Sequence, residues 1–241
     1  MVNVVGGIIL LDLFSSDRYR EFSVGSDAVC PDYYDWEVLL NKKEYKTFRF
    51  RAFKFVVDKG LALLVMPFIA CLAILFFFIN PMVNPGPVFF KQKRMGKDGK
   101  PFIMWKFRTM VPSDCESRDP NAPVETCRIK PFGMALRKSR VDELPNFISV
   151  LLGQMSLVGP RPDAFNHADS FSSKVLGYQE RHRVLPGITG LAQVEMGYAE
   201  GELETALKAK YDNIYVARCC GRMDLYIIFR TFGVVLRGLG K

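Results

Sequence analysis

The sequence predicts an α+β fold in which a long apolar helix accompanies a small domain made of a β-hairpin and helices. Three patterns lead to this prediction: an uncharged apolar run, two alternating segments around a glycine-bounded turn, and a later segment with apolar residues at helical spacing. The chain has 241 residues, enough for one domain with an appendage or for two small domains. We divide it into an N-terminal extension (1–49), an apolar helix (50–83) and a domain (84–241).

The apolar run extends from Leu61 to Ile79 and is long enough to cross a bilayer core at about 1.5 Å per residue. It starts too far from the N-terminus for a signal peptide. Pro67 removes a helix hydrogen bond, which predicts a kink near the middle of the run. Bases flank both ends, so the positive-inside rule gives no orientation. A re-entrant helix, a spanning helix and a buried core helix all stay open.

A β-hairpin is predicted after the Asn-Pro-Gly-Pro turn at 84–87, with its own turn at 96–99. In its second strand, apolar residues share one face and two cations share the other: Ile103, Trp105 and Phe107 against Lys106 and Arg108. From Lys91 to Arg108 the chain has seven bases and one acid. This stripe requires an anionic partner, such as nucleic acid, phospholipid or a phosphorylated substrate.

A helix is predicted downstream of a loop at 111–127. Apolar residues recur at helical spacing there: Leu144, Phe147, Ile148, Leu151 and Leu152. Pro145 is harmless only in the first turn, so the helix should begin near Asp142, and Gly153 should end it. Asp142 would then lie at or near the N-cap and Glu143 in the first turn. There, unpaired N–H groups and the helix macrodipole keep a carboxylate ionised and attract phosphate.

Cationic residues surround this acidic pair in the sequence. Arg137, Lys138 and Arg140 precede it, and Arg161 follows the helix between two prolines. A guanidinium on such a stiff backbone presents a planar fork that suits phosphate. The residues 186–190 are rich in turn formers and predict a loop, with Gln193 just beyond.

The C-terminal segment 223–241 predicts an amphipathic helix. Arg230 and Arg237 fall on one face, and apolar residues cover much of the rest. Such a helix suits the membrane interface, and it would equally suit packing on the domain core. The six cysteines form no CxxC pair and the two histidines lack ligand spacing, so free thiols and no zinc site are expected.

Together these motifs resemble the bacterial sugar transferase family over about residues 50–239. In order, and after a single apolar segment, they read NPGPVFFKQKRMGKDGKPFIMWKFRTM, LRKSRVDELPNFISVLLGQMSLVGPRP, PGITGLAQV and YVARCCGRMDLYII. The family comprises monotopic phosphoglycosyl transferases. The resemblance therefore implies an enzyme at the cytosolic face of the bacterial inner membrane that transfers a sugar-1-phosphate from a UDP-sugar to polyprenyl (undecaprenyl) phosphate and so begins glycan assembly.

The resemblance also implies roles for individual residues. Asp142 would be the nucleophile that forms a covalent phosphosugar ester and releases UMP, Glu143 would help to hold Mg²⁺, and Pro67 would kink a re-entrant helix. Phosphate contacts are expected from four residues: Lys106, Arg108, Arg137 and Arg161. Two residues are candidates for nucleotide or sugar contacts, Arg183 and Gln193. Leu185 departs from the basic residue often found before PGITG, and Arg183 would supply the missing charge.

The implied partners are a UDP-sugar, polyprenyl phosphate, inner-membrane phospholipid and downstream glycosyltransferases, and the sugar is not specified. The segment 1–49 matches no motif; a domain remnant, a cap and an oligomer contact, as in a homodimer, all stay open. An alternative function is a non-catalytic, membrane-tethered protein that binds anionic lipid or nucleic acid through the Lys91–Arg108 stripe. Nucleic acid is not expected as a partner, because the aromatic residues of the stripe should face away from its cations.

Cysteine labelling tests the arrangement of the apolar helix. We expect single cysteines placed before Lys54 and after Lys91 to react from the cytosolic side only, because a re-entrant helix keeps both of its ends on one face. Reaction from opposite sides would instead show a spanning helix.

Overall fold

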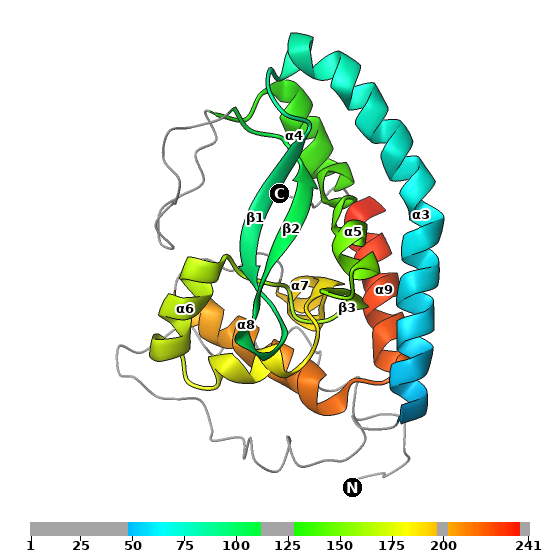
Figure 1. The fold of residues 1–241 in the computed structure, drawn as a ribbon. Helices are drawn as coiled ribbons and strands as arrows, with labels where there is room; N and C mark the ends of the chain where they lie inside the picture. The colour runs from blue at the N-terminus through cyan, green and yellow to red at the C-terminus, as the bar shows by residue number, and fades with distance from the viewer. Residues whose placement is uncertain (1–47, 112–127, 197–201, 237–241) are drawn as a thin grey trace, which may run out of the picture. The chain divides into compact units, whose positions relative to one another are not determined.

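The computed structural model describes residues 48–111, 128–196 and 202–236, which confirm an α+β architecture (Figure 1). These residues belong to one compact unit, Glu37–Lys241. All but the last two residues of the N-terminal extension, nearly all of the expected loop at 111–127, and Arg237 lie outside them. In chain order the elements are α3 (Phe48–Val83), β1 (Phe89–Met95), η3 (Lys97–Gly99), β2 (Pro101–Phe107), α4 (Pro131–Lys138), η5 (Val141–Glu143), α5 (Asn146–Leu151), β3 (Ser156–Val158), α6 (Phe165–Lys174), η6 (Tyr178–Arg183), β4 (Gly187–Thr189), α7 (Leu191–Glu195), α8 (Glu202–Arg218) and α9 (Gly221–Leu236).

The apolar run forms most of α3, a single helix of 36 residues that contains Pro67 and Pro81. The prolines do not interrupt it, and Figure 1 shows it bent along its length beside α5 and α9. One stripe of the helix is buried against the rest of the unit: Asp58, Ala62, Ile69, Phe76 and Asn80. Most other side chains of α3 are apolar and exposed. Among the described residues, α3 is the one helix long and apolar enough to cross a membrane.

Three charged side chains tie the N-terminal half of α3 to the domain. Lys59 Nζ donates to the carbonyl oxygen of Val150 at 2.7 Å and also to that of Leu151, at the C-terminal end of α5. A cation is stabilised there by the unpaired carbonyl groups of the helix end. Asp58 accepts a hydrogen bond from the backbone amide of Leu157, the central residue of β3. Lys54 pairs with the carboxylate of Asp224 in α9 at 2.7 Å. The helix is therefore an integral part of the unit.

The predicted hairpin is confirmed. β1 and β2 pair antiparallel, from Phe89 opposite Phe107 to Met95 opposite Pro101, across a tight turn. One face of β2 packs on α3 and α5 through Phe102 and Met104, both buried. The hydroxyl of a serine in α5 also donates to the backbone of β2. These contacts fix the strand that carries Lys106.

The predicted helix start near Asp142 is wrong in detail. Asp142 and Glu143 lie in η5, a 3₁₀ turn, and α5 begins at Asn146 with Pro145 as its N-cap. The backbone makes i→i+3 hydrogen bonds on both sides of Pro145, which itself has no N–H group to donate. The predicted stop is confirmed, since Gly153 has φ 76° just after α5 ends.

The predicted loop at 186–190 contains a strand, which corrects the sequence interpretation. β4 pairs parallel with β3, with Ser156 opposite Gly187. The two backbones lie so close that a Cβ atom on Gly187 would be 2.2 Å from the amide nitrogen of Gly159. The glycine that suggested a turn is therefore required for strand packing.

The C-terminal helix α9 combines the two arrangements that the sequence left open. Ile227 is buried in a core with Tyr215 of α8, while Leu225, Phe229 and Phe232 are exposed along the opposite side. The helix thus packs on the domain and also presents an apolar stripe.

Replacing Lys59 by methionine tests how strongly the domain holds α3. We expect a loss of about 1–3 kcal/mol in stability, because two carbonyl groups at the end of α5 lose a charged donor. Thermal unfolding of the detergent-solubilised protein measures this, with the exposed Lys100→Met as the matched control. Equal unfolding temperatures for both variants would contradict the proposed role of Lys59.

Candidate functional site

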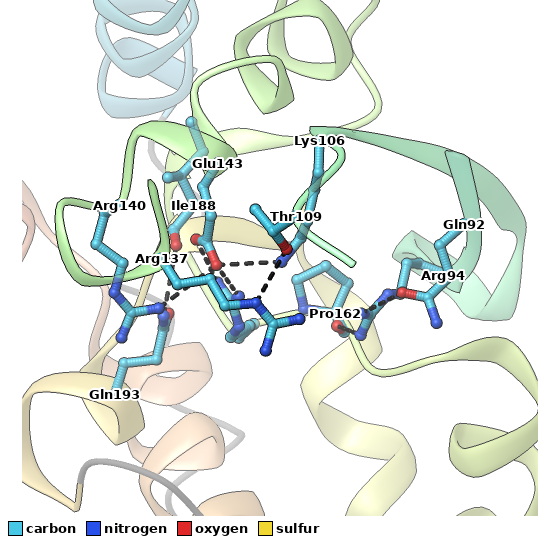
Figure 2. A network of polar contacts seen from close by, with 11 residues as sticks. Gln92, Arg94, Lys106, Thr109, Arg137, Arg140, Glu143, Pro162, Ile188 and Gln193 are labelled. Carbon is cyan, nitrogen blue, oxygen red and sulfur yellow. Dashed lines mark hydrogen bonds and ion pairs between the residues drawn. The ribbon is translucent and has the colours of Figure 1, made fainter. Parts of the chain in front are cut away.

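The candidate site is centred on the Glu143 carboxylate, which three cations contact (Figure 2). Arg161 binds both oxygens, with Nη2 at 2.5 Å from Oε1 and Nη1 at 3.0 Å from Oε2. Lys106 Nζ lies 3.1 Å from Oε1, and Arg140 Nη1 lies 3.4 Å from it. Glu143 is only 9% exposed. Such a bidentate, charge-assisted pair is strong and holds the carboxylate in one orientation.

These side chains come from separate parts of the chain. Lys106 comes from β2, Arg140 from the left-handed turn between α4 and η5, and Arg161 from the segment after β3. Arg137, in the last turn of α4, donates through Nε to Thr109 Oγ1 at 3.0 Å and lies beside them. The fold therefore gathers most of the expected phosphate ligands.

The charges of the site set its protonation states. Burial alone would raise the pKa of Glu143, but Arg161 and Lys106 hold that pKa well below its ordinary value. Burial lowers the pKa of Lys106 to about 8, although the negative charge of Glu143 opposes this. Glu143 is thus firmly ionised, and the charge of Lys106 depends on pH near neutrality.

Asp142 differs from its neighbour in its environment. It is 7% exposed, and its buried Oδ1 atom has no hydrogen-bond partner among the described residues. Burial and the negative charge of Glu143 raise its pKa above the ordinary value, and the positive charges of Lys106, Arg137 and Arg140 offset this only in part. The expectation that an α-helix start keeps Asp142 ionised is wrong, because α5 begins four residues later. The surrounding cations favour its charged form, against the effect of burial.

Backbone contacts hold the Arg161 segment. Arg181 Nη2 donates to the carbonyl oxygen of Arg161 at 2.6 Å, and Arg94 Nη1 to that of Pro162 at 2.9 Å. The carbonyl oxygen of Asp163 accepts from the last amide of β1 at 3.1 Å. Three successive carbonyl groups are therefore fixed, and the Arg161 side chain starts from a rigid backbone.

Beneath this segment lies a buried ion network. Arg181, with a side chain 1% exposed, pairs with Asp163 and with Asp212 Oδ2 at 2.7 Å. Lys208 Nζ lies 2.5 Å from Asp163 Oδ1, and the Tyr178 hydroxyl donates to Asp163 at 2.7 Å. Removing one member of such a group leaves a buried charge uncompensated. Sequence reasoning missed this network, because no spacing links 163, 181 and 212.

Two of the expected ligands lie elsewhere. The expectation that Arg108 points together with Lys106 is wrong. The Arg108 guanidinium instead donates to the backbone carbonyl oxygens of Pro87 at 2.7 Å and Asn84 at 2.5 Å, in the turn after α3. Because Arg108 follows the end of β2, strand alternation does not fix its direction. Arg183 is 55% exposed and pairs with Glu180 at 2.6 Å.

Gln193 lies at the edge of the cluster, where Figure 2 shows it near Arg140 and Ile188. Its amide nitrogen is 3.5 Å from the Ile188 carbonyl oxygen, and its buried Oε1 has no partner among the described residues. Its expected nucleotide or sugar contact stays a prediction.

The basic stripe differs from expectation in one respect. Lys91 and Trp105 are cross-strand partners, and Lys91 Nζ lies 4.4 Å from the ring centroid. The aromatic residues of the stripe therefore do not all face away from its cations, because the expectation treated one strand without its partner. That nucleic acid is not a partner stays a prediction, but the orientation of the aromatic residues no longer supports it.

Comparison with known proteins decides the family. The sequence profile of the bacterial sugar transferases matches residues 49–238. The chain belongs to the bacterial sugar transferase family. It is 44% identical over 152 residues to a UDP-glucose:undecaprenyl-phosphate glucose-1-phosphate transferase of Klebsiella pneumoniae. The aligned residues are 61% of this chain and 32% of the relative.

Two further relatives differ in the share of their own length that this chain matches. A UDP-N-acetylgalactosamine-undecaprenyl-phosphate N-acetylgalactosaminephosphotransferase of Aeromonas hydrophila is 36% identical over 179 residues, 74% of this chain and 42% of the relative. The exopolysaccharide production protein PSS of Rhizobium leguminosarum is 36% identical over 187 residues, 75% of this chain and 92% of the relative. The chain thus spans less than half of the first two enzymes and most of the third protein.

The cluster does not fit a magnesium ion as it is arranged. Mg²⁺ needs several oxygen ligands in octahedral geometry, whereas Glu143 Oε1 accepts from three cations and Oε2 from one, so a metal ion would meet their positive charges at close range. No group of three or more acidic, histidine or cysteine side chains that could hold a metal occurs in the part of the chain that the structure describes. Three positive groups around one carboxylate instead favour an anion.

A pH titration of anion binding tests the role of Lys106. We expect the affinity for sulfate, whose own charge is constant in this range, to fall roughly tenfold as pH rises through about 8, because Lys106 is protonated below its pKa and neutral above it. Isothermal titration calorimetry measures the affinity. Lys106→Arg should remove the decline, since arginine stays charged. A decline of the same size in that variant would contradict this assignment.

Proposed function

We propose that this protein is a phosphoglycosyl transferase that moves a sugar-1-phosphate from a UDP-sugar to undecaprenyl phosphate. The names of its relatives support this reaction class. One feature of the site carries the proposal: a buried carboxylate oxygen of Asp142 without a partner, beside Glu143 and surrounded by cations. An anionic nucleophile among fixed positive groups suits displacement at a phosphate.

In the first step, an Asp142 carboxylate oxygen attacks the β-phosphorus of the donor. A bond forms between this oxygen and phosphorus, the bond from phosphorus to the bridging oxygen breaks, and UMP leaves with that oxygen and its electron pair. The product is a phosphosugar ester of Asp142. Asp142 attacks as a carboxylate, so the step requires no proton transfer to a base.

The cations supply the electrostatic part of catalysis. Negative charge builds on the non-bridging oxygens and on the leaving phosphate as the bond breaks. Lys106 of β2, Arg137 of α4 and Arg161 after β3 come from different parts of the chain, so they can contact the diphosphate from several directions. Groups that are already oriented need no rearrangement when the charge develops.

In the second step, a phosphate oxygen of the lipid acceptor attacks the same phosphorus. The ester bond to Asp142 breaks, the carboxylate is regenerated, and the lipid leaves as a diphosphate-linked sugar. The two half-reactions use one nucleophile and one set of cations, so donor and acceptor phosphates bind in turn.

The surfaces of α3 and α9 support a membrane arrangement. The exposed side chains of α3 are mostly apolar, and α9 adds Leu225, Phe229 and Phe232. Near its N-terminal end α3 is tied to α9 by Lys54, and near its C-terminal end Phe76 packs against Phe107 of β2. Since both ends contact the same unit, we infer a re-entrant helix at the cytosolic face of the inner membrane, where the lipid acceptor is reached.

Replacing the nucleophile tests the reaction directly. We expect Asp142→Asn to lower UMP release from the preferred UDP-sugar by at least about 10³-fold, because the amide cannot form the ester. A screen of UDP-sugars with undecaprenyl phosphate and Mg²⁺ identifies the donor. Asp98→Asn, in the exposed hairpin turn, is the matched control and should keep full turnover.

A second readout examines the intermediate. Intact-protein mass spectrometry, with the acceptor lipid withheld, should detect a phosphosugar adduct on the wild type and none on Asp142→Asn. Wild-type turnover in that variant would show that Asp142 is not the nucleophile. No UMP release from any UDP-sugar would overturn the proposed function.

A further inference from the structure

The contacts of Glu143 point to an order of binding. Its two oxygens accept four contacts from three cations, and the bidentate Arg161 pair uses both oxygens at once. A divalent cation that approaches this carboxylate would displace a bound guanidinium or ammonium group. It would also meet the positive charge of the groups that remain.

The same cations are the groups that suit a diphosphate. Arg161 offers a planar fork, and Lys106 a point charge on a rigid strand. Glu143 and a phosphate therefore compete for the same donors. Of the two carboxylates at this site, Glu143 and Asp142, only Asp142 has a buried oxygen without a partner among the described residues, so little compensating charge for a metal is available until a new anion enters.

We propose that the donor's diphosphate must bind before, or together with, a divalent metal, because it takes Arg161 and Lys106 from Glu143 and thereby frees that carboxylate. The inference rests on the proposed diphosphate donor. Glu143 acts in the free protein as an internal substitute for the substrate anion. Metal affinity and anion affinity are then coupled, and the coupling is reciprocal.

Metal binding without nucleotide gives the first test. Mn²⁺ binding to the full-length, detergent-solubilised protein is followed by electron paramagnetic resonance. We expect the wild type to bind Mn²⁺ alone weakly, and Arg161→Met to bind it at least about tenfold more tightly, within the usual range of coupling between sites. Lys106→Met should change affinity in the same direction, which covers the case in which the Arg161 variant does not fold.

Controls separate this effect from a general change in charge. Arg222→Met removes an exposed arginine near the start of α9 and should leave Mn²⁺ affinity unchanged. Glu143→Gln should abolish any gain when combined with Arg161→Met. Wild-type protein that binds Mn²⁺ alone as tightly as Arg161→Met would overturn the proposal.

Anion binding without metal gives the reciprocal test. Calorimetry with UDP in the presence of EDTA should show Glu143→Gln binding at least about tenfold more tightly than the wild type, because the neutral amide releases Arg161 and Lys106. Equal or weaker UDP binding by Glu143→Gln would overturn the exchange.

These measurements need no turnover. Absent UMP release together with the expected affinity changes would reject the proposed function and keep the exchange. UMP release together with unchanged affinities would reject the exchange alone.

Discussion

The ion pair between Arg161 and Glu143 is the contact around which the site is built. It joins the segment after β3 to the η5 turn, and Lys106 extends it to the hairpin. Its geometry depends on a second layer, since Arg181 holds the backbone of Arg161 and is itself held by Asp163 and by α8. Opposite charges that are buried together impose a single arrangement, because any other would leave a charge without a partner.

This arrangement relates the apolar helix α3 to the cationic site. α3 packs along α5 and the hairpin through one buried stripe, and Phe76 contacts Phe107, the residue beside Lys106. A domain held this way keeps its phosphate-binding side chains at a fixed position relative to the apolar surface of α3. The proposed transfer to a lipid phosphate needs this relation, because the reacting phosphate stays near the membrane while its tail remains in lipid.

Much of the local structure was predictable from residue patterns. The hairpin around 96–99, the long helix and the helix stop at Gly153 follow from alternation, apolar length and glycine conformation. The 3₁₀ turn at Asp142 was missed, because an acidic pair before a proline is compatible with both an N-cap and a tighter turn. β4 was missed because its glycine serves close strand packing, and that requires knowledge of the partner strand.

By itself the sequence determined the apolar segment, the dyad at 142–143 and the set of cations from which the site is drawn, since these depend on residue type and short spacing. Only the tertiary structure decided how they are used: Arg161 and Lys106 bind Glu143, Arg108 braces a turn, and Asp142 keeps an unpaired oxygen. The reason is that a charged side chain takes the partner that the fold places within reach. Residues such as 108, 143 and 161 acquire partners through packing, which short-range patterns do not encode.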